Sequence, residues 1–323
     1  MADLDGISAG LIGEHFGSFD KIVFMDYDFE LEPENQALLE SFDEIVIADL
    51  SVNREYWDKL LSMGKKLRCY DHHDSSSWLT EYPEQAVHDQ KRSGAEILFD
   101  EHFSRKGRFK AIVREFITLV ATYDLWKDED PLFPEAQNLS RVLFGYRFWN
   151  EPNIRDAYFR FFDNTIKKLE RFEHWSWTSE ETAMIERAKV REQDEFNTAL
   201  RIMRFRKDTQ GRTFGVYHAG AKISIVCYRI FKETSLGEQL DYIICCNDFK
   251  DGWGKLSGRS KKGGFAVNSL KALDGHEPAA GGYITYEEAK MLYADPWCLR
   301  HDSEEGDDLL APTEEISIRW RKL

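Results

Sequence analysis

The triplet Asp71-His72-His73 is the stretch of this sequence best suited to chemistry. It follows a short, partly apolar run, Leu67 to Tyr70, that is typical of a β-strand. A carboxylate and two imidazoles at a strand end would bring an oxygen and two nitrogens into one corner. Both groups are good ligands for Mn²⁺ or Zn²⁺. A buried histidine pair is more often structural than catalytic, so the triplet indicates a metal site only if other acids join it.

Further acids lie at the ends of predicted elements. Asp3 and Asp5 stand two residues apart beside a glycine, where a tight turn would let both carboxylates face one cation. Asp49 ends an apolar run, and Asp124 ends a long apolar helix between aromatic residues. Each pattern also has a simpler interpretation. The first two acids could cap a helix, and Asp124 could pair with Lys127.

The elements that must position these side chains alternate along the first half of the chain. Strand-like apolar runs are predicted at 21–25, 44–48 and 67–70, with amphipathic helices at 33–42 and 53–63, a loop at 74–90, and helices at 93–99 and 112–121. Apolar runs separated by single helices are typical of βαβ units and a parallel sheet. Functional groups in such sheets collect beyond the carboxyl ends of the strands, where Asp49 and the triplet are expected.

The second half of the chain predicts a different architecture. Two charged helical stretches, 154–172 and 180–205, are expected to link two domains with solvated faces, and a homodimer surface is the alternative. Beyond them a smaller α/β domain is predicted. Its strands are placed at 213–217, 223–228, 242–246 and 255–260, and its helices at 235–239 and 265–273. The expected domains are residues 1–152, a helical linker over 153–207, and residues 208–323.

Composition narrows the functional classes. The 323 residues are 42% hydrophobic, and the formal net charge of −15 argues against a protein that releases counterions along duplex nucleic acid. A strongly acidic chain that handles nucleotides is expected to take short ones, with metal ions supplying the positive charge. Five scattered cysteines without a CxxC pair support neither a zinc ribbon nor a disulfide framework. Without an apolar run of membrane-spanning length or a signal peptide, the cytoplasm is the expected location.

One glycine-rich loop is locally basic. Arg259 is followed by Lys261, Lys262 and the pair Gly263-Gly264. Backbone amides freed by glycine, next to a guanidinium, would suit a phosphate or a base edge, and a solvated turn is the alternative.

Taken together, these motifs resemble the DHH phosphoesterases. Asp3-Leu-Asp5-Gly6, Ala48-Asp49-Leu-Ser51, Asp71-His72-His73 and Tyr123-Asp124 occur in the order of that family's four motifs. The flanking residues, including Arg92-Ser-Gly-Ala-Glu96, look most like the NrnB-type oligoribonucleases. Downstream, Lys255-Leu-Ser-Gly-Arg259-Ser260 and Gly275-His276-Glu-Pro-Ala-Ala-Gly281 are similar to the glycine- and histidine-rich motif of the DHHA1 domain.

The resemblance implies two Mn²⁺ ions, with Mg²⁺ or Co²⁺ as alternatives. Asp3 and Asp49 would hold the first ion, and the second would be held by Asp5, Asp49, His72 and Asp124. Asp71 would orient His72, and His73 would touch the substrate phosphate. The family usually has a strand and a His or Asp ahead of the acid that matches Asp3. Because the chain begins at Met1, either its start is truncated or that metal position is incomplete.

The resemblance also implies a second set of residues that grip the substrate. These substrate-binding residues are Arg259, Ser260, Gly275, His276 and Gly281. The predicted protein is therefore a metal-dependent phosphodiesterase with an N-terminal DHH domain and a C-terminal DHHA1 domain. It would hydrolyse short RNA or DNA oligonucleotides (nanoRNA), or linear dinucleotides, to nucleoside monophosphates. The alternatives are a cyclic-dinucleotide phosphodiesterase, a RecJ-like single-strand exonuclease, and a catalytically weak protein that sequesters nucleotides.

Overall fold

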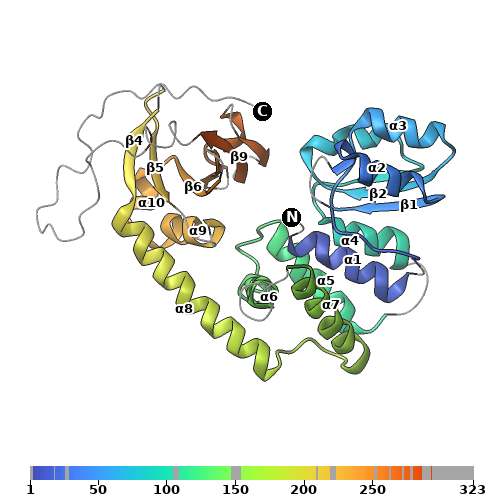
Figure 1. Cartoon of the computed structure of the whole chain (residues 1–323). Coiled ribbons are helices and arrows are strands. Elements are labelled where there is room, and N and C mark those ends of the chain that lie inside the picture. The colour runs from blue at the N-terminus through green and yellow to red at the C-terminus, as the bar shows by residue number, and fades with distance from the viewer. Residues whose placement is uncertain are drawn as a thin grey trace, which may run out of the picture. The chain divides into compact units, whose positions relative to one another are not determined.

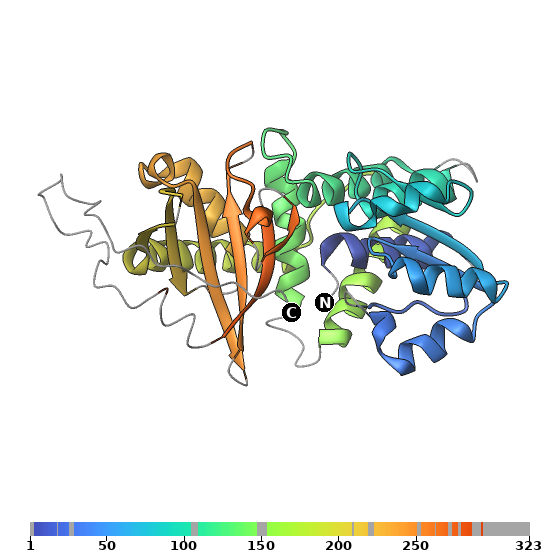
Figure 2. The same cartoon turned by 90° about the horizontal axis from the view of Figure 1, so that it is seen from above.

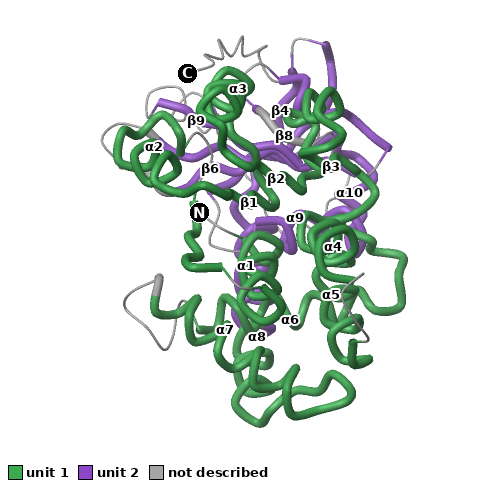
Figure 3. Tube along the Cα trace, turned by 90° about the vertical axis from the view of Figure 1, so that its right-hand side faces the viewer, with its two compact units in different colours: residues 1–188 green, residues 189–323 purple. Residues whose placement is uncertain are grey.

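The chain folds into two compact units that divide between Ala188 and Lys189 (Figure 3). The computed structural model describes residues 3–17, 19–25, 29–104, 109–146, 154–208, 210–218, 223–250, 253–261, 263–270, 273–276, 279–285 and 292. Each unit combines helices with a sheet of its own, the first of three parallel strands and the second of six. The expected mixed α/β class with an N-terminal parallel sheet is therefore confirmed.

The sheet of the first unit has the order β1-β2-β3. Its strands are β1 (Glu44–Ala48), β2 (Lys66–Asp71) and β3 (Ala86–His88). Helix α3 (Arg54–Ser62), capped by the side chain of Asn53, joins the first two strands. A 3-10 helix, η2 (Asp74–Glu81), joins the last two. All pairs are parallel, so the carboxyl ends of the strands meet at one edge.

Alternating side chains bury both faces of this sheet. Ile45, Ile47 and Leu67 pack with Trp57 and Leu60 of α3 on one face. The opposite face packs on a larger core built by the other helices of the unit. Those helices are α1 (Leu4–Phe16), α4 (Gly94–Leu98), α5 (Ala111–Asp124), α6 (Phe133–Gly145) and α7 (Ile154–Arg171). Figure 1 shows α1 and α4 on one side of β1 and β2, with α3 and α2 (Pro33–Glu40) on the other.

Two expectations for the first unit are wrong. Residues 21–25 form no strand. The ring of Phe24 instead packs against Tyr158 and Phe162 of α7. This apolar side chain therefore contacts a helix and is not part of the sheet. The expected loop 74–90 contains η2 and β3. Three residues are too short a strand to leave a periodic pattern, so β3 depends on its pairing with β2.

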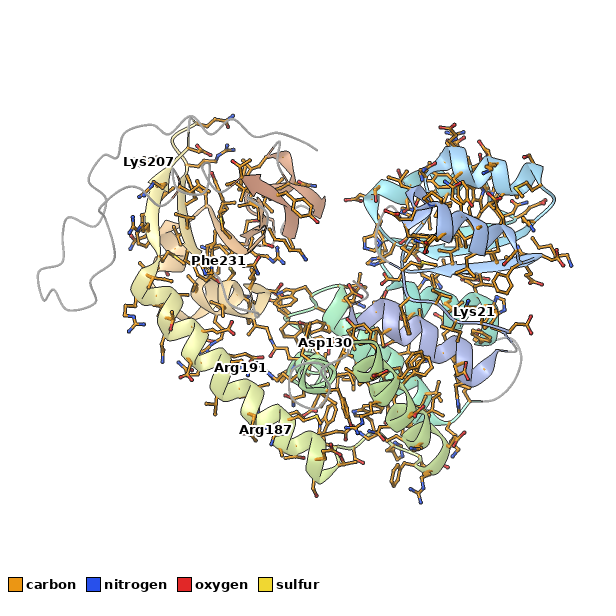
Figure 4. The ribbon with its side chains drawn as sticks, in the orientation of Figure 1. Lys21, Asp130, Arg187, Arg191, Lys207 and Phe231 are labelled. Atoms are coloured by element: carbon orange, nitrogen blue, oxygen red, sulfur yellow. The ribbon has the colours of Figure 1, made fainter. Side chains whose placement is uncertain are left out.

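Helices α7 and α8 (Ser179–Ile202) correspond to the predicted linker. Side chains of α7, including Phe161 and Leu169, belong to the large core of the first unit. Helix α8 runs across the division between the units, with Arg187 and Arg191 on either side of it (Figure 4). The predicted domain boundaries at 152/153 and 207/208 remain predictions.

The sheet of the second unit has the order β4-β5-β6-β7-β9-β8. Its strands are β4 (Arg204–Lys207), β5 (Thr213–His218), β6 (Tyr242–Lys250), β7 (Trp253–Ser260), β8 (Asp274–His276) and β9 (Ala279–Thr285). In the view from above, its strands run side by side (Figure 2). Only β5 and β6 pair in parallel, and the other neighbours are antiparallel. One face packs on α8 and α9 (Ile223–Glu233), including Phe231 (Figure 4).

Two expectations for the second unit are also wrong. Residues 223–228 begin helix α9 and are not a strand. Parallel strands need a crossover, and α9, followed by the short α10 (Leu236–Gln239), supplies it between β5 and β6. Ile223, Val226, Cys227 and Ile230 indeed have helical spacing. In the stretch 265–273, the described residues form only a 3-10 turn, Val267–Ser269.

None of the helices in the described part of the chain is long and apolar enough to cross a membrane.

Candidate metal centre

Asp49 stands immediately beyond β1 with an unusual backbone. Its φ of 63° lies in the left-handed region, which aspartate tolerates better than most residues. Its amide donates to the carbonyl oxygen of Tyr70 at 2.9 Å, which holds this conformation against the end of β2. The start of α4 lies against the same backbone, because a Cβ on Gly94 would stand 2.7 Å from the Cα of Asp49.

The ring of His72 faces two carboxylates. Strand β2 ends at Asp71, and the next residue places its Nε2 atom 3.3 Å from Oδ1 of Asp49 and 3.4 Å from Oδ2 of Asp124. Asp124 is the last residue of α5, so three separate elements contribute to the cluster. Beyond it the chain turns at Asp130, whose carbonyl oxygen accepts from the amide of Phe133 at the start of α6 (Figure 4).

Asp5 comes to the cluster from the first turn of α1. Its carboxylate is fully buried and accepts hydrogen bonds from the amides of Gly94 at 2.6 Å and Ala95 at 3.2 Å. Asp3 is the N-cap of the same helix and accepts from the amides of Asp5 and Gly6. The simpler interpretation, a capping acid, therefore holds for Asp3. Its carboxylate is also close enough to raise the pKa values of Asp5, Asp49 and Asp124.

The acids of this cluster resist ionisation when no cation is present. Burial, together with the charge of Asp3, raises the pKa of Asp5 from 3.8 to about 6. Burial and the charge of Asp5 raise the pKa values of Asp49 and Asp124 well above their ordinary range. Oδ1 of Asp49 and Oδ2 of Asp124 are buried and accept no hydrogen bond from the described residues. Buried acceptors of this kind need a cation or a proton.

Two sets of ligand atoms have metal-site spacing. Asp5, His72 and Asp124 offer atoms within 4.8 Å of one another, as do Asp49, His72 and His73. Carboxylate oxygens with one or two imidazole nitrogens suit Mn²⁺ and similar divalent ions. The residues present therefore fit the metal implied by the sequence resemblance.

Asp71 supports the other histidine of the triplet. It is fully buried, and its Oδ1 accepts from Nδ1 of His73 at 2.8 Å and from the backbone amide of His72 at 2.8 Å. We expected Asp71 to orient the ring of His72, but its hydrogen bond to an imidazole is to His73. The reason is geometric, because the ring of His72 is turned toward Asp49 and Asp124.

The interaction between Asp71 and His73 shifts the pKa values of both side chains. Burial alone raises the pKa of Asp71, but its hydrogen bond and charge interaction with His73 hold it below the ordinary value of 3.8. Burial alone lowers the pKa of His73, but Asp71 raises it above 6.5. The carbonyl oxygen of His73 also lies 2.8 Å from Nε2 of His88 at the end of β3. His73 is thus held through both its ring and its backbone.

Sequence reasoning did not assign the segment Ser93-Gly94-Ala95 to the site. It noted these residues only as part of the family resemblance. The sequence did contain a signal for this segment. A serine N-cap followed by a glycine marks the start of a helix, where the first backbone amides can donate to a carboxylate. His88 was missed because β3 was expected to be a loop.

The predicted substrate-binding residues of the second unit lie at one corner of its sheet. Backbone pairing puts Arg259, Ala279 and His276 in one row across β7, β9 and β8, and Ser257, Gly281 and Asp274 in another. Gly275 pairs with Ala280 between these rows. Lys262, assigned to the basic loop, lies outside the described residues.

The side chains of Arg259 and Ser260 are engaged within the second unit. The guanidinium of Arg259 donates to Oγ of Ser224 at 3.0 Å from Nη2 and to the carbonyl oxygen of Gly258 at 2.7 Å. Ser260 donates to the carbonyl oxygen of Phe265 at 2.5 Å. These hydrogen bonds hold both side chains in place within the second unit.

Comparisons with known proteins find similarity only among solved structures. No protein-family model matches the chain. No curated protein matches it either. A pGpG-specific phosphodiesterase, PggH from Vibrio cholerae, superposes with a TM-score of 0.48 and 13% identity, over 90% of this chain and 93% of that one.

Two further solved structures are similar over comparable lengths. A DHH domain from a protein described as a member of a family of ribosomal proteins has a TM-score of 0.41 and 14% identity, over 91% of this chain and 83% of that one. An uncharacterized protein from Helicobacter pylori has a TM-score of 0.34 and 17% identity, over 90% and 95%. The site itself defines the class of this protein: an α/β protein whose carboxylates and histidines gather beyond the ends of parallel strands.

Proposed function

We propose that the chain is a metal-dependent phosphodiesterase of the DHH type, most similar to the NrnB-type oligoribonucleases. Its proposed substrates are short RNA or DNA oligonucleotides or linear dinucleotides, which it would hydrolyse to nucleoside monophosphates. The observation that carries the proposal is the position of His72, whose Nε2 atom lies within 3.4 Å of carboxylates from two other elements. Both carboxylates have a buried oxygen that accepts no hydrogen bond from the described residues.

The ligands of the proposed centre are the buried Asp5, Asp49 and His72 and the partly buried Asp124, with Asp3 at its margin. Two divalent ions bound there would lower the pKa of a water molecule and neutralise the charge that develops on a phosphodiester. The surrounding residues hold the metal ligands in position. The amides of Gly94 and Ala95 hold Asp5, and the pairing of Asp49 with Tyr70 holds the strand end.

His73 is proposed to bind the scissile phosphate. Its raised pKa favours the protonated imidazolium, which attracts a phosphate oxygen. Its Nδ1 donates to Asp71, which fixes the orientation of the ring. Arg259, Ser260, Gly275, His276 and Gly281 are proposed to bind the rest of the nucleotide.

The test is hydrolysis of a 5′-labelled RNA trimer and of linear pGpG by the purified protein with Mn²⁺. The matched variants are Asp49→Asn, His72→Gln and Asp124→Asn, each nearly isosteric with the native residue. We expect each to lose at least about 100-fold in turnover, because each removes a metal ligand. Glu129→Gln is the control, since it removes one carboxylate from an exposed position five residues beyond Asp124.

The outcome separates the proposal from its alternatives. Turnover of cyclic dinucleotides in preference to linear ones would identify a cyclic-dinucleotide phosphodiesterase, and processive cleavage of long single strands would identify a RecJ-like enzyme. Tight binding of trimer without turnover at any Mn²⁺, Mg²⁺ or Co²⁺ concentration would contradict hydrolysis and indicate a sequestering protein.

A further inference from the structure

Two buried cysteines of the second unit meet face to face. Sγ of Cys227 on α9 lies 3.6 Å from Sγ of Cys245 on β6. Both side chains are almost completely buried, and both are free thiols. The contact joins a helix to the sheet on which it packs, so it connects two elements that the sequence separates by 18 residues.

The other described cysteines occupy different surroundings. Cys246 follows Cys245 on β6 and therefore packs on the opposite face of the sheet, in a separate core cluster. Cys69 lies on β2 in the first unit, 3.5 Å from the carbonyl oxygen of Leu50. Either position provides a matched control, because each is a buried cysteine outside any disulfide.

The two thiols of the pair are not equivalent. The hydroxyl of Tyr217 lies 3.7 Å from Sγ of Cys227. Burial alone raises the pKa of Cys227, but Cys245, the charge of Arg259 and Tyr217 together hold it below the ordinary value of 9.0. Burial and the neighbouring Cys227 raise the pKa of Cys245 well above that value. A thiolate is the reactive form of cysteine, so Cys227 is the expected nucleophile.

We propose that Cys227 and Cys245 form a reversible disulfide when the protein meets a hydroperoxide. A disulfide needs the sulfurs at about 2.05 Å. The atoms must therefore approach by about 1.5 Å from their present separation, so the proposal requires side-chain rotation with a small shift of α9.

The reaction balances with a hydroperoxide as the oxidant. The Cys227 thiolate attacks the peroxide oxygen, the O–O bond breaks, and a sulfenic acid forms while hydroxide leaves and takes up a proton as water. The sulfur of Cys245 then attacks the sulfenic sulfur. The S–S bond forms and a second water leaves with the thiol proton. Two thiols are oxidised, one hydrogen peroxide is reduced to two waters, and a dithiol reductant reverses the change.

The bond would act on the predicted substrate-binding corner. Ser224, one helical turn before Cys227, accepts from two nitrogens of the Arg259 guanidinium, at 3.0 and 3.3 Å. A shift of α9 toward β6 moves this serine relative to the arginine. This consequence rests on the proposed function, whereas formation of the disulfide does not. Oxidation is therefore expected to change KM for the oligonucleotide more than kcat.

The test treats the full chain, natively folded, with hydrogen peroxide, and counts free thiols before and after denaturation. Peptide mapping by mass spectrometry is expected to find Cys227 linked to Cys245, with two thiols lost and both recovered by dithiothreitol. Cys246→Ala is expected to behave like the unmodified protein. Cys227→Ala and Cys245→Ala are expected to form no such link.

Several results would overturn the proposal. One is a native protein that keeps both thiols under oxidant concentrations that oxidise them after unfolding. Another is oxidation of Cys227 to a sulfinic acid without formation of a disulfide with Cys245. Both results come from the unmodified protein, so they hold even if a variant fails to fold. Because thiol counting needs no substrate, an inactive protein that still forms the link would contradict the proposed function alone.

Discussion

Gly94 and Asp49 lie so close that no side chain fits between them. A Cβ on Gly94 would stand 2.7 Å from both Cα and Cβ of Asp49 and 2.8 Å from its backbone nitrogen. Asp49 also holds a left-handed backbone at this point. The first turn of α4 and the end of β1 therefore meet backbone to backbone, and the amides of Gly94 and Ala95 reach Asp5 as a result.

Gly94→Ala is expected to disturb the metal centre through this contact. The added methyl group must push backbone atoms apart, at a cost of about 1–3 kcal/mol in stability. It should also reduce the rise in Tm that Mn²⁺ produces. Gly64→Ala is the control, because Gly64 has a φ of 77° and open space around it. That variant should lose about 1 kcal/mol from backbone strain and keep the full metal response. An unchanged metal response in Gly94→Ala would contradict the role of this contact.

Metal-free protein is expected to lose stability as pH rises from about 4 to 6. The folded pKa of Asp5 is about 6 and its unfolded value is 3.8, so the folded state binds more protons in this window. The contribution of Asp5 to stability must therefore fall as pH increases, by on the order of 3 kcal/mol, and this contribution levels off above the folded pKa. Denaturant unfolding in EDTA across pH 4–8 measures the slope.

The same argument predicts how the metal response depends on pH. Mn²⁺ should stabilise the protein more at pH 8 than at pH 5, because protons compete for the same carboxylates at low pH. Asp5→Asn should flatten the slope and weaken the metal response together. A metal response equal at both pH values would argue against a cation bound by buried acids.

Asp71→Asn is expected to lower the pKa of His73. The variant keeps an oxygen to accept from Nδ1 but removes the charge that stabilises the imidazolium. NMR titration of the His73 ring should detect the shift, and turnover should fall about 10- to 100-fold. Asp74→Asn, an exposed acid three residues later, should leave both unchanged. A His73 titration identical in Asp71→Asn and the unmodified protein would show that the pairing is unimportant.

Lys168 is expected to stabilise the turn between α7 and α8. Its ammonium lies 2.5 Å from a carboxylate oxygen of Glu181 and donates to the carbonyl oxygen of Ser176 at 2.8 Å, and both charged side chains are buried. It also lies over the rings of Trp175 and Trp177. Lys168→Met leaves the Glu181 charge buried without a countercharge, which should cost about 3–5 kcal/mol in guanidinium unfolding.

Two companion variants make the Lys168 result interpretable. Lys167→Met changes the same residue type at an exposed neighbouring position and should cost little. Lys168→Met combined with Glu181→Leu removes both charges and should recover part of the lost stability. A double variant as unstable as the sum of the single ones would mean that the pair is not coupled.

The sequence by itself determined the parts of this protein that depend on local order. Hydrophobic periodicity predicts the strands at 44–48 and 67–70 and the helix between them. This periodicity is a local property of the sequence and does not depend on tertiary contacts. Functional groups collect at the carboxyl ends of parallel strands, and this rule predicts from the sequence that Asp49 and His72 lie close together. The residue types alone therefore predicted a metal site made of carboxylates and imidazoles.

Only the tertiary structure decided which neighbours these residues have. Residues 21–25 look like a strand but pack against helices, and 223–228 look like a strand but form the crossover between β5 and β6. Asp71 supports His73 because the ring of His72 turns toward Asp49 and Asp124. The 3.6 Å approach of Cys227 to Cys245 has no counterpart in the sequence. Contacts between distant segments depend on how elements pack, and periodicity records only that a side chain is buried, not what it is buried against.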